Sequence, residues 1–318
     1  MIVLWLLAFA AGVALIVWGA EAFAEHLGHA SVQLGVSAFA LALLLAGAEP
    51  EELATAVVAS LRGSPGIALG DVVGANVAIC LVALGVGAWI APLPFRAAVM
   101  RYALLGLPLG AIAAWFAWDG RVSRPEGIVL VALYALYIGA IWIIERRPPD
   151  LGEVGELAEA REAASAGKQR RFGRDLALVL AGLIAMAAGA TLLVEAVQRL
   201  TGIEAAQTRL GLTLVGFATG FELIVLAWSA ARRGMAEAVV AGVVGSFAYN
   251  VTMTLGAGAL ARPLVLADAP VLHIPLVLML GSLALVMLLA ARHGRLGRTD
   301  GAVLLAAYPA FIAWVLLA

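Results

Sequence analysis

Charged residues and cysteine are scarce in this sequence. Charged side chains make up 13% of its 318 residues, about half of the fraction that is usual in soluble proteins. No basic cluster of the sequence suggests nucleic acid as a partner. The single cysteine, Cys80, excludes an intramolecular disulfide. The remaining residues are mostly hydrophobic, 64% in all, and form runs of membrane-spanning length, so we predict an all-α polytopic membrane protein embedded in a lipid bilayer.

Ten apolar segments reach the length of roughly 20 residues that a helix needs to cross a bilayer. They are residues 2–25, 31–61, 66–91, 98–118, 125–145, 175–198, 208–231, 235–260, 268–291 and 300–317. Gly47–Pro50 and Gly70–Gly74 interrupt the second and third spans, and Gly216–Gly220 and Gly242–Gly245 interrupt the seventh and eighth. Broken helices in matching positions of two halves are typical of transporters that bind their substrate near the middle of the membrane.

One long polar segment, residues 146–174, divides the chain into two halves of five spans each. We predict an N-terminal repeat of residues 1–145, a linker with a helix over Glu153–Ala166, and a C-terminal repeat of residues 175–318. An N-terminus outside the cell places the linker and most lysines and arginines in the cytoplasm, as the positive-inside rule requires, and leaves the C-terminus outside. Because five is odd, the two halves enter the membrane in opposite orientations. The short chain, without the regulatory domains of eukaryotic transporters, indicates a bacterial inner membrane.

The two halves also share sequence. Arg62–Ala88 aligns without a gap with Arg233–Ala259, and nine of the 27 positions are identical. The identities include Val72-Val73-Gly74, which matches Val243-Val244-Gly245. We interpret this match as an internal repeat, and the odd number of spans makes it an inverted one.

The stretch Gly47–Glu52 reads Gly-Ala-Glu-Pro-Glu-Glu and lies between two apolar runs. A carboxylate near the middle of a bilayer costs roughly 2.5–3.5 kcal/mol on the insertion scale, so these three acids require partners, protons or a cation. Pro50 also breaks the helix and leaves backbone carbonyl groups without helical partners. A related stretch, Gly216–Glu222, places an acid in the second half. Carboxylates together with freed carbonyls inside a membrane predict a cation site.

Each half contains two motifs in the same order. The first half reads Gly-Ala-Glu-Pro-Glu-Glu-Leu at 47–53 and Gly-Ala-Asn at 74–76. The second half reads Ala-Thr-Gly-Phe-Glu-Leu at 218–223 and Gly-Ser-Phe-Ala-Tyr-Asn at 245–250. These stretches resemble the cation/calcium exchanger superfamily, the sodium/calcium exchanger membrane region, whose members have Gly-Thr-Ser-x-Pro-Glu-Leu followed by Gly-Ser-Asn-x-x-Asn. The resemblance implies ten transmembrane helices in two inverted five-helix repeats, with helices 2, 3, 7 and 8 broken.

Carried over to this sequence, the resemblance implies that Glu52 and Glu222 are the principal metal ligands. Internal symmetry keeps an alternative open, because the alignment of the two repeats places Glu51, and not Glu52, opposite Glu222. The other candidates of the second half are polar side chains at the ligand positions of the family, Thr219, Ser246 and Asn250.

The first half departs from the family pattern. Ala48 and Glu49 stand where the family has Thr-Ser, Ala75 stands in place of Ser, and Ile79 lies where a polar ligand is expected. The oxygens that coordinate sodium in sodium-coupled members are therefore largely missing from this half. Glu49 compensates if it shares a helix face with the principal acid. The alternative for Glu49 and for Glu51 is a solvated position in an aqueous vestibule.

Two polar residues of the third span remain open in role. Asp71 is an ion ligand or a proton relay, or else it caps the interruption of the helix. Asn76 is expected to bond freed backbone carbonyls rather than the ion.

These features imply a secondary active antiporter that exchanges Ca²⁺ for Na⁺ or H⁺ by alternating access. It is not an enzyme, and it has no cofactor apart from the transported divalent and monovalent cations. A site with several carboxylates cannot cheaply cross the membrane empty and charged, so exchange is obligatory. The resemblance further implies that the first and sixth spans slide over a core made of the second, third, seventh and eighth.

Three alternatives remain, and two of them, a scaffold and a hydrolase, belong to other classes of function. The missing hydroxyl groups suit coupling to protons or another divalent ion, and they also suit a non-transporting membrane scaffold that has lost its ligands. An intramembrane acid hydrolase would need paired aspartates, and Gly70-Asp71 has no evident partner in the sequence.

Overall fold

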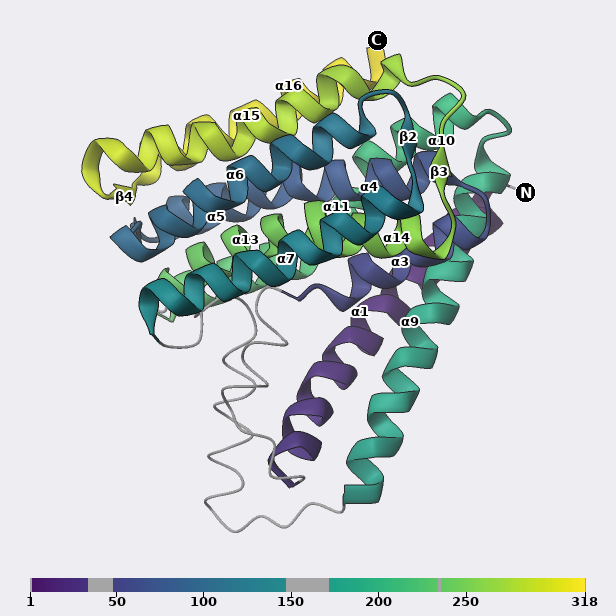
Figure 1. Cartoon of the computed structure of the whole chain (residues 1–318), viewed down its shortest axis with the longest axis horizontal. Helices are drawn as coiled ribbons and strands as arrows, with labels where there is room; N and C mark the ends of the chain where they lie inside the picture. The colour runs from purple at the N-terminus through teal and green to yellow at the C-terminus, as the bar shows by residue number, and fades with distance from the viewer. Residues whose placement is uncertain (1, 34–47, 147–171, 234–235, 318) are drawn as a thin grey trace.

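The computed structural model describes residues 2–33, 48–146, 172–233 and 236–317 (Figure 1). The helices of the first half are α1 (Ile2–Gln33), α3 (Pro50–Leu61), α4 (Pro65–Ala78), α5 (Leu84–Ile90), α6 (Ala97–Ala117) and α7 (Arg124–Glu145). Those of the second half are α9 (Phe172–Leu200), α10 (Glu204–Leu210), α11 (Gly216–Thr219), α12 (Phe221–Arg232), α13 (Ala236–Tyr249), α14 (Leu255–Ala261), α15 (Pro270–His293) and α16 (Arg298–Leu317). Nine helices of the described part are long and apolar enough to cross a membrane.

Three short π-helices join these elements into longer rods. They are η1 (Ile79–Ala83), η2 (Gly211–Val215) and η3 (Asn250–Thr254). Thus α4, η1 and α5 form one continuous span, as do α13, η3 and α14. The predicted second span is described only from Ala48, and most of the predicted linker, with its helix over Glu153–Ala166, lies outside the described residues.

The expected interruptions at Gly70–Gly74 and Gly242–Gly245 are wrong. Both stretches lie inside continuous helices, α4 and α13. The irregular turns follow farther along each span, as the π-helices η1 and η3. In contrast, the break at Gly216–Gly220 is confirmed, because α11 ends at Thr219 and α12 begins at Phe221 after a turn.

The glycines of α4 allow close packing instead of breaking the helix. A Cβ atom on Gly70 would lie 2.8 Å from the backbone nitrogen of Leu212 and 2.8 Å from the carbonyl oxygen of Thr208. α4 therefore lies against η2 and α11 with backbone touching backbone. Small residues promote this kind of helix contact in membranes because they remove the side chains that would keep the backbones apart.

Element boundaries recur along the chain at a constant spacing. α3 and α12 begin at residues 50 and 221, α4 and α13 at 65 and 236, and η1 and η3 at 79 and 250, so every pair has the separation that aligns Arg62 with Arg233.

Short antiparallel strands connect the halves. β1 (Leu93–Pro94) pairs with β4 (Arg295–Leu296), and β2 (Arg121–Val122) pairs with β3 (Leu264–Val265).

α1 and α9 form a closely packed pair that runs at a steep angle to α6, α7, α15 and α16 (Figure 1). Two glycine contacts hold them together. A Cβ atom on Gly12 would lie 2.8 Å from the carbonyl oxygen of Gly189, and one on Gly19 would lie 2.7 Å from that of Gly182. The pair therefore has a continuous backbone interface of its own.

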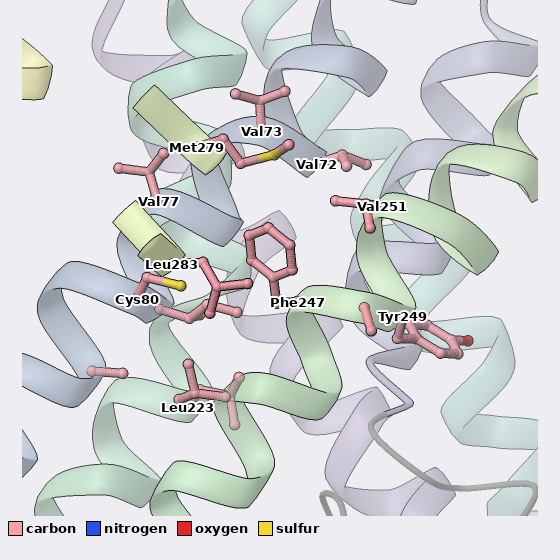
Figure 2. Packing of buried hydrophobic residues seen from close by; sticks show 14 of the residues in the cluster. Val72, Val73, Val77, Cys80, Leu223, Phe247, Tyr249, Val251, Met279 and Leu283 are labelled. Atoms are coloured by element: carbon pink, nitrogen blue, oxygen red, sulfur yellow. The ribbon is translucent and has the colours of Figure 1, made fainter. Parts of the chain in front are cut away.

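The other helices surround a core in which α4, α13 and α15 meet. Phe247 of α13 is fully buried and lies among Val77, Met279 and Leu283 (Figure 2). This apolar packing lies directly beside the polar side chains described below, because Ser246 and Phe247 are neighbours on α13.

We predict that Gly70→Ala destabilises the protein by about 1–3 kcal/mol, because its Cβ meets backbone atoms that cannot rotate away. The gain of about 1 kcal/mol in helix propensity is too small to offset this. The measurement is the melting temperature in detergent. The matched control is Gly281→Ala in α15, whose Cβ meets nothing within 4 Å; equal melting temperatures for the two variants would contradict the packing argument.

Candidate cation site

Three acids lie at the start of α3. Glu49 precedes the helix, Pro50 is its first residue, and Glu51 and Glu52 lie in its first turn. Proline suits this position because its missing N–H group would have no helical partner there. Glu49 and Glu51 are 7% and 2% exposed, and Glu52 is fully buried. The alternative that one of Glu49 and Glu51 is solvated in a vestibule is therefore wrong. The partial positive charge of the helix N-terminus acts favourably on these acids.

The second half repeats this arrangement with one acid. Glu222 lies in the first turn of α12, directly after the turn at Gly220, and its Oε2 is buried. Glu51 and Glu222 are each the second residue of their helix, so the structure keeps the internal symmetry that pairs them. Each half thus places a carboxylate at a helix N-terminus, although Glu222 is only half-buried whereas Glu51 is buried.

Asp71 connects the third span to the seventh. The hydroxyl of Thr219, the last residue of α11, donates a hydrogen bond of 2.8 Å to Oδ1 of Asp71. The second carboxylate oxygen, Oδ2, is buried without a hydrogen-bond partner. Asp71 lies in the middle of α4, so the alternative that it caps a helix is wrong, and its carboxylate has an oxygen available for an ion.

Glu49 and Ser246 form a second connection between the halves. The Ser246 hydroxyl on α13 donates a short hydrogen bond to Oε1 of Glu49. Glu51 lies within hydrogen-bonding reach of the Glu49 side chain. Glu49, which stands where the family motif has a hydroxyl residue, thus accepts a hydrogen bond from the hydroxyl of Ser246 in the opposite repeat.

Glu52 is at the centre of the cluster. Its carboxylate is close enough to Asp71, Glu51 and Glu222 for their charges to act on it, and the side chain of Asn250 lies beside it. Neither oxygen of Glu52 has a hydrogen-bond partner, and the Nδ2 group of Asn250 has none either. This acid, the one that the family motif singles out, is therefore buried among like charges with both oxygens unsatisfied.

Sequence reasoning missed two residues, Thr254 and Met279, that contact predicted polar groups of the site. Thr254 donates to Oδ1 of Asn250 at 3.3 Å, four residues along η3, and this spacing was the only signal for it. Asn76 contacts the sulfur of Met279 at 3.9 Å, and its Oδ1 is unpartnered. The expected bond from Asn76 to freed backbone carbonyls is absent from the described part of the chain, because α4 is unbroken there.

On the side of the site formed by α4 and η1, apolar side chains stand where the family motif has polar ones. Ala75 and Ile79 are fully buried. A Cβ atom on Gly220 would lie 3.1 Å from Cγ2 of Ile79, so this side of α4 and η1 supports the turn before α12. Within the described residues these two positions offer no side-chain oxygen to an ion.

The cluster has no basic counterpart that the structure describes. The groups acting on Glu49, Glu51, Glu52 and Asp71 are one another, Glu222, and the neutral side chains Ser246, Thr219 and Asn250. Among the described residues, no three histidine, cysteine or acidic side chains gather tightly enough to hold a metal ion by themselves. A cation here would take a mixed shell of carboxylate, hydroxyl and amide oxygens, which is the shell that Ca²⁺ accepts.

A model of the sodium/calcium exchanger protein family matches residues 4–143 and 175–317 of this chain. The chain belongs to this family. The resemblance inferred from the two motifs is thereby confirmed, and the protein is a member of a family of membrane transporters.

Several relatives match along most of their length. The chain is 26% identical to the sodium/calcium exchanger MaX1 of Methanosarcina acetivorans, with 95% of each chain covered. It is 24% identical to the putative antiporter CaxA of Alkalimonas amylolytica over 93% of this chain and 94% of the relative. An uncharacterized membrane protein of Methanocaldococcus jannaschii is 25% identical over 92% of this chain and 89% of its own length. The similarity therefore extends over both halves.

The fold is that of a solved exchanger. The structure of the sodium-calcium exchanger NCX_Mj soaked with Na⁺ and Sr²⁺ superimposes with a TM-score of 0.62 at 25% identity, covering 98% of this chain and 99% of that one.

We predict that Glu52→Gln abolishes stabilisation by Ca²⁺ without lowering the melting temperature of the ion-free protein. The amide keeps the shape of the side chain and removes a charge that has no hydrogen-bond partner. A ligand at 100 times its Kd stabilises by about 2.7 kcal/mol, so a loss is measurable by thermal unfolding with and without Ca²⁺. Glu21→Gln, at an exposed position of α1, is the control and should keep the Ca²⁺ response. A full response in Glu52→Gln would remove this acid from the site.

Proposed function

We propose that the protein is a secondary active antiporter that exchanges Ca²⁺ for Na⁺ or H⁺ by alternating access. The observation that carries this proposal is the buried acid cluster that both halves contribute to. Glu49, Glu51, Glu52 and Asp71 have only acidic or neutral groups around them. Inside a membrane such a cluster requires positive charge, and a transported cation supplies it.

The same electrostatics make exchange obligatory. Two or more carboxylates crossing the hydrocarbon region without compensation would each cost several kcal/mol or more. The site therefore reorients only when a divalent ion, or monovalent ions or protons, neutralise it. Calcium binds through about 6–8 oxygen atoms at roughly 2.3–2.6 Å, and the carboxylates of Glu52 and Glu222 together with Thr219, Ser246 and Asn250 are the ligands that we assign to it. Glu49, Glu51, Asp71 and Asn76 are the further candidates.

The relatives support this assignment of ions. MaX1 is named a sodium/calcium exchanger, CaxA a putative antiporter, and NCX_Mj a sodium-calcium exchanger that was soaked with Na⁺ and Sr²⁺. These names apply to those proteins, and their similarity to this chain favours the same class of substrate here.

We infer that the full architecture is two inverted repeats of five spans, with α1 and α9 as the pair that moves. The separation along the chain is the same between α3 and α12 as between α4 and α13, which supports the repeat. The separate backbone interface of α1 with α9 supports movement as a unit. The predicted orientation in a bacterial inner membrane, with both termini outside and the linker in the cytoplasm, follows from the distribution of lysine and arginine.

One observation favours a second candidate, coupling to protons or transport of another divalent ion. Ala48, Ala75 and Ile79 remove side-chain oxygens from the first half, whereas Glu49 adds a carboxylate. The same departures are what a non-transporting scaffold would have. A scaffold and a transporter differ in one measurable respect, since only the transporter uses a counter-ion gradient to drive calcium across the membrane.

The test is uptake of radiolabelled Ca²⁺ into proteoliposomes loaded with Na⁺, with acid, or with neither. We expect uptake with at least one of the two gradients and at least a tenfold loss in Glu222→Gln, since that variant lacks a carboxylate of the site; a loss of about 1.4 kcal/mol corresponds to tenfold. The exposed variant Glu21→Gln is the control and should transport normally. Uptake driven by Na⁺ alone or by acid alone identifies the coupling ion. Folded wild-type protein that takes up no Ca²⁺ under either gradient would rule out the antiporter.

A further inference from the structure

A group of polar contacts ties the end of α9 to the turn between α3 and α4. Nη1 of Arg62 lies 2.6 Å from Oε2 of Glu195, and Nε of Arg199 lies 3.0 Å from Oε1 of the same carboxylate. Gln198 donates a further hydrogen bond to Ser64 in the turn. α9 also packs along α3. We call the end of the molecule with these contacts the Arg62 face.

The repeat places the same kinds of side chain at the opposite end. α3 ends at residue 61 and α12 at residue 232, so Arg62 and Arg233 each follow the last residue of their helix. The turn after α12 is therefore the counterpart of the turn that binds α9.

The glycine contacts of α1 and α9 identify the counterpart of Glu195. Gly12 contacts Gly189, and Gly19 contacts Gly182, so residues 12 and 19 of α1 occupy places equivalent to those of residues 182 and 189 of α9. The same shift along the chain relates Glu25 to Glu195. Each half therefore has an acid near the end of its α1 or α9 helix and an arginine after its α3 or α12 helix.

Of these two arginine–glutamate pairs, Arg62 and Glu195 form an ion pair in the described part of the structure, whereas Arg233 and Glu25 do not. Arg233 is exposed, and its side chain forms no ion pair or hydrogen bond with the described residues. Within the same part of the chain, α1 does not pack along α12 in the way that α9 packs along α3. The α1–α9 pair is thus docked asymmetrically on two halves that are otherwise related by the repeat.

A cavity lies on the other side of the docked pair. Its volume is about 870 Å³, and it separates α1 and α9 from α3 and α7. It extends from Leu27 and Trp142, near the ends of α1 and α7, to Pro50 and Tyr249 beside the acid cluster. His26 of α1 bonds at 3.0 Å to Asp175 of α9 at the same end of the pair as Leu27. Asp175 lies in the first turn of the long helix α9, whereas Glu195 lies five residues before its end, so the cavity lies toward the end opposite the Arg62 face.

We propose that the pair Arg62–Glu195 and the pair Arg233–Glu25 are alternative latches at the two faces of the membrane. The structure has the Arg62 latch closed and the cavity on the other side. When α1 and α9 slide as one unit relative to the other helices, the Arg62 latch opens and the Arg233 latch forms. This inference rests on the proposed function, because reorientation is a step of alternating access. Exposed ion pairs are individually weak, so each latch biases the two states by roughly two- to fivefold and does not lock them.

The test measures which side of the membrane reaches the cavity. Ala187, which lines the cavity on α9, is replaced by cysteine in a Cys80→Ala background, and a membrane-impermeant maleimide is added from either side of oriented vesicles. Arg62→Gln should lower the labelling rate from the side opposite the Arg62 face by roughly two- to fivefold, and Arg233→Gln should not lower it. Exchanging the charges, Arg62→Glu with Glu195→Arg, should restore the rate. Arg262→Gln is the matched control, because its guanidinium lies next to Gly63 on the same face and does not pair with Glu195.

Two results would overturn the latches. One is a change in the same direction for Arg62→Gln and Arg233→Gln; the other is an effect of Arg62→Gln no larger than that of Arg262→Gln. Calcium uptake by the same vesicles separates this inference from the proposed function. Wild-type vesicles that transport Ca²⁺ while the latch variants label like wild type would overturn the latches alone, whereas absence of uptake would overturn the antiporter.

Discussion

The structure depends on one electrostatic constraint, the burial of several carboxylates in a protein whose other interior side chains are mostly apolar, with neutral polar groups among them. Glu52 has no hydrogen-bond partner for either oxygen, and Asp71 has none for Oδ2. The N-termini of α3 and α12 each provide a partial positive charge of roughly half an elementary charge, which is less than these acids require. The remaining compensation must come from a bound cation or from protons, and this requirement connects the fold to transport.

Close helix packing brings those carboxylates into contact with the opposite half. Gly70 allows α4 to lie against η2, and this contact positions Asp71 next to Thr219 at the end of α11. A side chain at Gly70 would push α4 away from η2 and lengthen the hydrogen bond between the two halves. The glycines therefore act on the site through the distance between helices, although none of them supplies a side-chain ligand.

Glycine is also where sequence reasoning reached its limit. In a membrane span a glycine cluster favours either a break or a close contact, and the sequence alone does not distinguish the two. Gly216–Gly220 forms a break, whereas Gly70–Gly74 forms a contact.

The acids of the site were predictable because charge within an apolar run is costly wherever the run folds. Their partners were not, since the bonds Glu49–Ser246 and Thr219–Asp71 depend on the register between two halves distant in sequence. The π-helices η1 and η3 had no signal, because their residues continue the helical pattern.

The two halves divide the chemistry of the site between them. When the repeats are aligned, Ala48 corresponds to Thr219, Ala75 to Ser246 and Ile79 to Asn250, so at these three positions the second half has a neutral oxygen and the first half is apolar. The extra acids have the opposite distribution, because Asp71 corresponds to a glycine of α13 and Glu49 to the glycine of the turn before α12.

Two hydroxyl groups of the second half donate to acids of the first, Thr219 to Asp71 and Ser246 to Glu49. A cation that enters the site competes for those carboxylate oxygens, and the hydroxyl groups that it displaces can then turn their own oxygens toward it. In the proposed antiporter, ion binding rearranges these contacts between the halves, so it acts on the contacts that alternating access would change.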